Sequence, residues 1–260
     1  MLTVAATVSA VIAFSATSAL YGADLASERR TGNVGQLGFW TSAALTAVVA
    51  VAIGASEGLS ALVRGGGLFA TLALLTAGGF LAVRRAFKVR VAAALVAPVC
   101  GLMLLLSLVL PYQSATVEDA YQTLLLTHVG LALLGLGTFA LSAVLATLYL
   151  VQERQLRQRQ FGRLFQRLPS LEELDTASFR LVVLGFVIYT VALLVGFLWF
   201  FQVDAGGSSV RIVFAMVAWV AFAAVIHTRI TSGWRGRQAA WMTVGGALSS
   251  FAVLAGYTLA

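Results

Sequence analysis

Two histidines are the side chains of this sequence best suited to bind an iron centre inside a membrane. His128 and His227 are the only histidines of the chain, and each lies in or beside a long apolar segment. A neutral imidazole can sit in a bilayer, and it is a common axial ligand of haem iron. An isolated histidine near the end of such a segment is also commonly an ordinary hydrogen-bonded residue, so both interpretations stay open for each position.

The spacing of the two histidines argues against one shared haem. At the rise of a helix they differ in depth by about 15–20 Å, whereas two axial ligands of one iron hold their backbones roughly a dozen ångströms apart. We therefore expect separate sites, or one ligand and one structural histidine. Met103 and Met216 lie near the predicted depth of His128 and are candidate second ligands. A methionine in an apolar segment is far more often a packing residue.

The other side chains offer little for catalysis. No interior of an apolar segment carries Asp, Glu, Lys or Arg, whereas ion-coupled carriers commonly place such groups at mid-membrane. The sequence has no glycine-rich phosphate loop, no Ser/His/Asp set and no histidine pair at metal-ligand spacing. Cys100, the single cysteine, lies in an apolar stretch and is expected to be an inert buried thiol. The sequence therefore predicts a binding protein without catalytic residues, not an enzyme.

The composition places these residues in a membrane. Hydrophobic residues make up 60% of the chain and charged residues 10%, whereas a soluble domain carries about 25% charged residues. Uncharged apolar stretches of about 20 residues are long enough to cross a bilayer as helices. The sequence predicts an all-α polytopic membrane helical bundle of about eight transmembrane helices, in a single membrane domain over residues 1–260. The predicted segments are 1–20, 36–55, 66–83, 91–111, 123–150, 181–202, 212–228 and 238–258.

The basic residues set the expected orientation. All basic residues except Arg64 and Arg211 lie in the alternate loops 21–35, 84–90, 152–180 and 229–237. Arg64 and Arg211 lie in the loops on the opposite side of the predicted spans. Because basic loops stay in the cytoplasm, both termini are predicted to lie outside it, in a multi-pass protein of a bacterial inner (cytoplasmic) membrane. No Lys or Arg precedes the first apolar run, so we expect a retained span and no signal peptide. Charge confined to short loops also argues against a nucleic-acid partner.

The longest predicted loop, residues 152–180, has its own apolar pattern. Apolar residues recur there at mostly three-to-four spacing among Arg and Gln, at Leu156, Phe161, Leu164, Phe165 and Leu168. This pattern predicts an amphipathic cytoplasmic helix on the inner leaflet, with arginines that reach acidic headgroups. Ser170 and Glu173 form a capping box that starts the next helix. A surface anchor is the simpler interpretation, and a docking site for a cytoplasmic partner is the alternative.

Several segments together resemble a known family. They are Thr127-His128-Val129-Gly130, 148–154, Phe161-Gly162-Arg163, 168–175, Ala224-Val225-Ile226-His227 and 233–240. This combination is similar to the HemX/CcsA-like membrane proteins of cytochrome c assembly, and the resemblance covers most of the chain from about residue 66 onward. It implies an eight-helix membrane protein that binds or presents haem. It also implies that His128 and His227 correspond to histidines that serve haem in that family.

The sequence departs from the haem lyases of that family. Its loop 200–211 contains no Trp, although the resemblance implies a Trp-rich haem-binding loop at this position. No histidine precedes His128 or follows His227, so further histidines found in relatives are absent. These departures favour a HemX-type accessory that handles haem, expected as haem b, in cytochrome c assembly or in regulation of haem synthesis.

The expected partners are haem, the lipid bilayer and other cytochrome c assembly proteins, or a haem-synthesis enzyme at loop 152–180. Two alternatives remain: a cofactor-free scaffold that recruits a cytoplasmic partner, and a transporter of haem or another small molecule.

Overall fold

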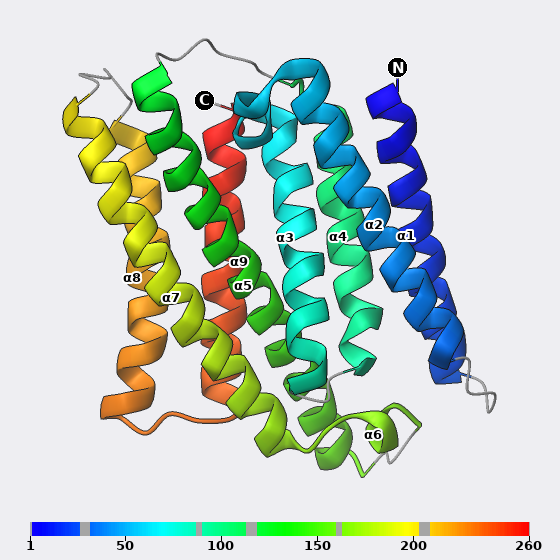
Figure 1. The fold of residues 1–260 in the computed structure, drawn as a ribbon. Coiled ribbons are helices and arrows are strands. Elements are labelled where there is room, and N and C mark those ends of the chain that lie inside the picture. Colours follow the sequence, from blue (N-terminus) through cyan, green and yellow to red (C-terminus); the bar gives the residue numbers. More distant parts are fainter. Residues whose placement is uncertain are drawn as a thin grey trace. The chain divides into compact units, whose positions relative to one another are not determined.

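The computed structural model describes residues 2–26, 32–86, 90–112, 119–159, 163–202 and 209–259, and the regular structure in these ranges is helical. The chain divides into two compact units, which are described separately (Figure 1). Unit 1 comprises Met1–Ala115 and Gln152–Ser170. Unit 2 comprises Thr116–Val151 and Leu171–Ala260.

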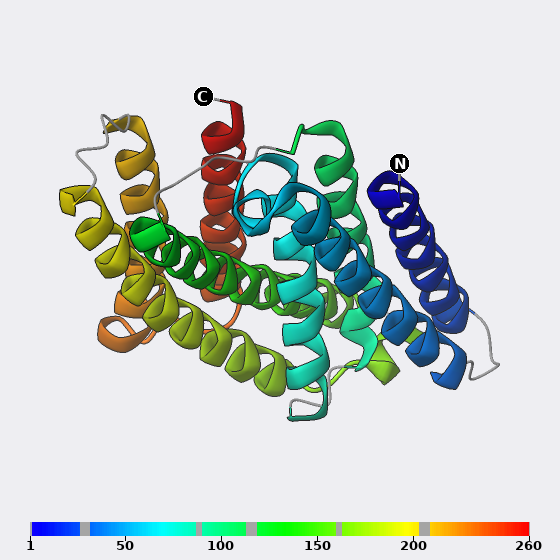
Figure 2. The same cartoon turned by 45° about the horizontal axis from the view of Figure 1, so that its top comes forward.

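Four helices form the body of unit 1 and lie side by side (Figures 1 and 2). They are α1 (Leu2–Ala26), α2 (Gly32–Glu57), α3 (Gly65–Ala86) and α4 (Ala93–Val109), with short 3-10 helices at Leu59–Val63 and Arg90–Ala92. Phe39 of α2 packs its ring against Phe14 of α1 and Phe80 of α3, at centroid distances of 5.8 and 4.9 Å. All three rings are essentially inaccessible to solvent, so they form the centre of this bundle.

Segment 152–170 belongs to unit 1 and differs from the single amphipathic helix that its pattern predicts. Helix α5 (Asp119–Arg157) continues into the segment, and the five-residue α6 (Arg163–Arg167) follows. Between them, Arg159 adopts a left-handed φ of 53°. Arg167 of α6 pairs with Asp24 at the end of α1, and Gln152 donates a hydrogen bond to the carbonyl of Pro169 at 3.0 Å. The segment is therefore held by contacts within unit 1. Phe161 lies outside the described residues.

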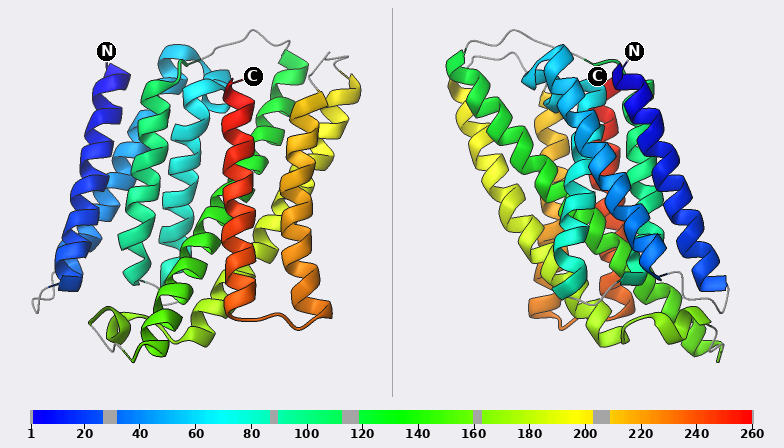
Figure 3. Two further views of the ribbon diagram at one scale, coloured as in Figure 1. Left: turned by 180° about the vertical axis from the view of Figure 1, so that it is seen from behind. Right: turned by 45° about the vertical axis from the view of Figure 1, so that its right-hand side comes forward.

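Unit 2 contains α5 up to Val151, α7 (Leu171–Gln202), α8 (Ser209–Thr231) and α9 (Arg237–Leu259). Figure 3 shows α5 and α7 side by side along much of their length. Gly135 and Gly185 mark their close approach, because a Cβ added at Gly185 would lie 2.7 Å from the ring of Phe139. The Phe139 ring stacks on Phe222 of α8 at 3.4 Å between centroids. Helix α7 begins at Leu171, directly after Ser170, as the capping box predicts.

The helices have the length and surface of membrane spans. Among the described residues, five helices are long and apolar enough to cross a bilayer: Thr3–Asp24, Val34–Glu57, Gly65–Arg84, Gln122–Arg157 and Leu171–Leu198. Two further apolar helices, Ala93–Val109 and Ala215–Thr231, are shorter. Exposed apolar side chains recur along α7, at Leu184, Val187, Val191, Leu194 and Leu198, and such a stripe suits lipid, not water. The predicted all-α polytopic membrane bundle is confirmed, and each of the eight predicted segments overlaps one long helix.

Candidate functional site

His128 lies near the start of α5, and its imidazole is held by the backbone of α7. The Nδ1 atom is 2.7 Å from the carbonyl oxygen of Ala192. Because a carbonyl oxygen can only accept, Nδ1 carries the proton and donates it. The Nε2 atom then keeps its lone pair, and no partner of Nε2 occurs among the residues that the structure describes. This tautomer is the one that presents Nε2 as a ligand.

Gly196 provides the space that the His128 ring occupies. A Cβ added at Gly196 would lie 2.5 Å from Cε1 and 2.7 Å from Nδ1 of His128, closer than real Cβ contacts come. The half-buried ring therefore rests where a side chain of α7 would otherwise stand. Sequence reasoning missed Gly196 and Ala192, because nothing in the run Val195-Gly196-Phe197 shows that α5 passes beside it.

The chemistry of His128 fits an axial haem ligand. Metal-binding histidines almost always donate the other ring N–H to a carbonyl or carboxylate, which fixes the tautomer and the ring orientation. His128 makes this kind of bond to Ala192, and the bond leaves Nε2 as the nitrogen available for ligation. A cluster of three or more His, Cys, Asp or Glu that could hold a bare metal ion does not occur in the described ranges.

His227 has a different environment. It lies in the last turns of α8 with an exposed side chain, and its backbone carbonyl accepts a hydrogen bond from Thr231 at 2.7 Å. No hydrogen bond to its imidazole occurs in the part of the chain that the structure describes. Nothing in this structure selects one ring nitrogen of His227 as a ligand.

The structure does not bring His128 and His227 together. Helices α7 and α8 run antiparallel, since Asp175 near the start of α7 pairs with Arg229 near the end of α8. His128 is instead bound at Ala192, about 17 residues further along α7, which corresponds to about 25 Å. Of the candidate second ligands, Met103 is buried inside unit 1 and Met216 on α8 is 36% exposed.

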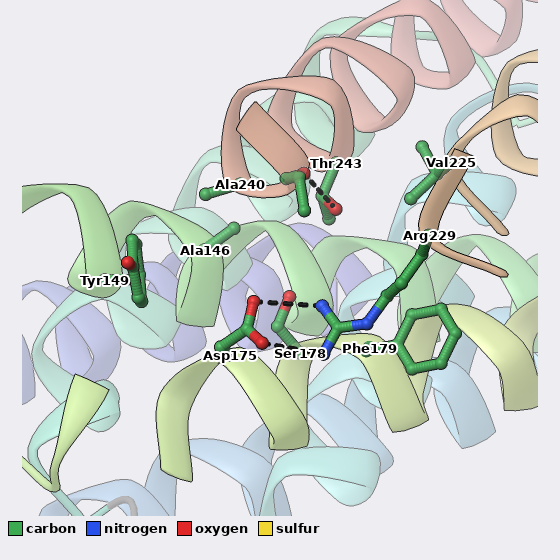
Figure 4. Close-up of a pocket in the computed structure, with 10 residues that line it drawn as sticks. Ala146, Tyr149, Asp175, Ser178, Phe179, Val225, Arg229, Ala240 and Thr243 are labelled. Atoms are coloured by element: carbon green, nitrogen blue, oxygen red, sulfur yellow. Dashed lines mark hydrogen bonds and ion pairs between the residues drawn. The ribbon is translucent and has the colours of Figure 1, made fainter. Parts of the chain in front are cut away.

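A second polar cluster ties the helices of unit 2 together at the opposite end of α7. Both carboxylate oxygens of Asp175 accept hydrogen bonds from Arg229, at 2.9 and 2.6 Å (Figure 4). The backbone N–H of Gly236 donates to the same carboxylate at 3.2 Å. The guanidinium of Arg229 also lies 4.2 Å from the ring centre of Phe179. This set joins α7, α8 and the start of α9.

The pocket beside this ion pair is small. It is lined from all four helices of unit 2 and has an empty volume of about 290 Å³, including space open to solvent. The hydroxyl groups of its lining are engaged within the protein, since Ser178 donates to Ser142 and Thr243 donates to Ala239. The cluster therefore acts as a structural tie. Sequence reasoning assigned no role to the Asp175–Arg229 pair.

Comparisons with known proteins identify relatives of the chain. Protein HemX of Brevibacillus brevis is 34% identical over 99 residues, which cover 37% of this chain and 36% of the relative. The cytochrome c biogenesis protein CcsA of Synechococcus sp. (strain RCC307) is 37% identical over 79 residues, covering 29% and 25% of the two chains. CcsA of Trichormus variabilis is 38% identical over 85 residues, covering 31% and 24%.

These alignments span between 24% and 36% of the length of the relatives. No solved structure matches the chain. The family described as cytochrome C assembly protein matches residues 60–256. That range contains α3 to α8, most of α9 and both histidines, and it confirms the family that the sequence segments indicate: this chain is a member of the cytochrome c assembly protein family.

Proposed function

We propose that this protein is a haem-binding accessory of cytochrome c assembly or of the regulation of haem synthesis, and that His128 is its main haem ligand. The observation that carries the proposal is the hydrogen bond from Nδ1 of His128 to the carbonyl of Ala192. This bond leaves Nε2 as the ligating atom in a half-buried position. Haem, when bound, would supply an iron centre that Nε2 of His128 could ligate; the expected form is haem b.

The residues around His128 suit binding and orientation. Gly196 leaves the ring its place against α7, and the carbonyl of Ala192 fixes the tautomer. His227 would serve a separate haem contact, because its place on α8 lies far from His128 along the bundle. In the proposed orientation, with both termini outside the cytoplasm, His128 lies toward the outer face and His227 toward the inner face.

An accessory role is favoured over a haem lyase. A haem lyase presents haem to the thiol pair of an apocytochrome. For this, the loop after α7 would need aromatic side chains that flank the haem and a second histidine that ligates its iron. Loop 200–211 has no Trp and no His in the sequence. The chain would thus bind haem without catalysing its attachment, and other assembly proteins would receive or supply the haem.

The test is haem titration of the protein in mild detergent, followed by absorption spectra of the oxidised and reduced states. We expect a Soret band in the wild type, loss of that band in His128→Ala, and retention of most of it in His227→Ala. Thr127→Ala, one residue away, is the matched control and should bind haem as the wild type does. A wild type without a Soret band after addition of haemin, or a His128→Ala variant with an unchanged band, would contradict the proposal.

Segment 152–170 is the proposed contact for a cytoplasmic partner, such as a haem-synthesis enzyme or another assembly protein. Arg154, Arg157 and Arg159 are all exposed there, but Arg157 pairs with Glu153 at 2.7 Å, and Arg167 pairs with Asp24. Arg154 and Arg159 would therefore supply the charge for recognition. Replacing Arg154 and Arg159 by Glu should release such a partner, and Arg157→Glu alone should have the smaller effect.

A further inference from the structure

The turn between α8 and α9, residues 232–236, is fixed in place by hydrogen bonds from both sides. The N–H groups of Ser232 and Trp234 both donate to the carbonyl of Thr228, at 3.1 and 3.3 Å. The N–H of Gly236 donates to Asp175, which is itself held by Arg229. Gly233 and Gly236 adopt left-handed φ values of 65° and 70°, which favour glycine and allow the chain to reverse here. The turn is thus positioned by the tie at the start of α7.

This fixed turn presents large apolar side chains beside basic ones. Trp234 is 39% exposed, and Ile230 and Trp241 on either side of the turn are 72% and 58% exposed. Arg235 is exposed between them. Figure 3 shows the turn in orange, where it joins the ends of the two helices. A tryptophan beside an arginine at the end of apolar helices is typical of the headgroup region of a bilayer. There the indole ring can contact the acyl chains while the guanidinium reaches the charged headgroups.

The charged residues of this segment are all basic. Residues 229–241 contain Arg229, Arg235 and Arg237 and no Asp or Glu. Arg229 is engaged by Asp175, and Arg237 is exposed but also makes an interaction within the protein. Arg235 is therefore the exposed guanidinium that a bound anion would contact. A soluble anion would use the charge but would leave Trp234 and Ile230 in water. A phospholipid satisfies both, because its headgroup carries the negative charge and its acyl chains cover the apolar side chains.

We propose that residues 230–241 form a binding site for an anionic phospholipid, with Arg235 on the headgroup and Trp234 at the level of the glycerol and upper acyl chains. The site differs from a general attraction between a basic loop and a membrane, because hydrogen bonds from the backbone N–H groups of Trp234 and Gly236 fix the turn that carries Trp234 and Arg235. It does not depend on haem binding at His128.

The test uses lipids with brominated acyl chains, which quench tryptophan fluorescence at short range, and the full-length protein in defined vesicles. Quenching by brominated phosphatidylglycerol is compared with quenching by brominated phosphatidylcholine at equal mole fraction. We expect a preference of about fivefold for phosphatidylglycerol, the ratio expected for one basic residue near an anionic surface. Arg235→Gln should abolish the preference, Arg235→Lys should retain most of it, and Trp234→Phe should remove the excess quenching.

Arg180→Gln is the matched control, since it removes one exposed arginine from α7, outside residues 230–241. It should leave the preference unchanged. Equal quenching by the two lipids in the wild type would overturn the proposal. So would a preference that survives in Arg235→Gln, or one that Arg180→Gln reduces equally, because the charge of the whole surface would then explain the effect.

Discussion

The two ends of α7 contact neighbouring helices in contrasting ways. Near Leu171, the carboxylate of Asp175 accepts two hydrogen bonds from Arg229 and a third from the backbone of Gly236. In the last third of α7, at Ala192, the imidazole of His128 makes one hydrogen bond to the helix and keeps the lone pair of Nε2 unused among the described residues. Both regions join helices through polar groups. Only the His128 region has an atom, Nε2, that could still ligate a metal.

This difference distinguishes a polar cluster that holds helices together from a polar side chain that can bind a ligand. A polar group in an apolar bundle is costly unless it is paired, so a fully bonded set such as Asp175 and Arg229 can hold helices but has little capacity left for a ligand. A group that is oriented by one bond and left open at its other atom is prepared for a partner. We therefore assign the structural tie to the Asp175 end and the candidate haem contact to the His128 end.

The largest effect on stability is expected at the ion pair. Arg229→Ala would leave the carboxylate of Asp175 with one donor in a site where that side chain is 16% exposed. We expect a loss of about 3 kcal/mol in the free energy of unfolding, because an unpaired charge remains in a poorly solvated place. Thermal unfolding in detergent, followed by circular dichroism, measures this loss.

Arg157→Ala is the control for that experiment. Arg157 also pairs with a carboxylate, that of Glu153, but its side chain is 67% exposed. Its loss should cost less than about 1 kcal/mol. Equal destabilisation by the two substitutions would remove the structural distinction between the Asp175 cluster and an ordinary surface pair.

Much of this fold could be predicted from the sequence, and the reason is physical. A membrane-spanning helix must be long and apolar, and it must form its backbone hydrogen bonds within itself. Each span can therefore be predicted from its own residues. The eight apolar segments accordingly mark eight helices. The helix ends differ from the predicted ones: α5 extends to Arg157 and α7 starts at Leu171, beyond the predicted spans 123–150 and 181–202.

The candidate site was predictable only in part. His128 and His227 stand out because imidazoles are rare and chemically distinctive in apolar segments. Gly196, Ala192 and the Asp175–Arg229 pair depend on which helices are neighbours, and hydropathy contains no information about that pairing. The break at Arg159, which divides the predicted amphipathic helix, also depends on contacts of segment 152–170 with residues distant in sequence, such as Asp24.

An intermediate effect is expected from Gly196→Ala. The added methyl group would lie 2.5 Å from the His128 ring and would force it away from the carbonyl of Ala192. We expect haem affinity to fall at least about tenfold, with a loss of stability of about 1–3 kcal/mol from overpacking. Haem titration and thermal unfolding measure the two quantities.

Gly130→Ala is the matched control, since Gly130 lies on α5 close to His128 and a Cβ there meets nothing within 4 Å. This variant should bind haem normally. If Gly196→Ala also binds haem normally, the orientation of His128 by α7 has no part in binding.

The smallest effect is expected from Ser178→Ala, within unit 2. Its hydroxyl donates to the carbonyl of Ser142 at 3.0 Å, and both residues are buried. The loss should be about 1 kcal/mol of stability with no change in haem affinity, because the bond joins α5 to α7 at a distance from His128. A change in the haem spectrum of this variant would show that the two ends of α7 are coupled.

The most direct test of haem ligation by His128 is the absorption spectrum of the haem-loaded His128→Cys variant beside that of the wild type. This substitution exchanges the ligating atom from nitrogen to sulfur. If His128 ligates the iron, the variant should show either the shifted Soret band of thiolate ligation or a weakened band. A Soret band of unchanged position and intensity would show that another residue binds haem and would contradict the account.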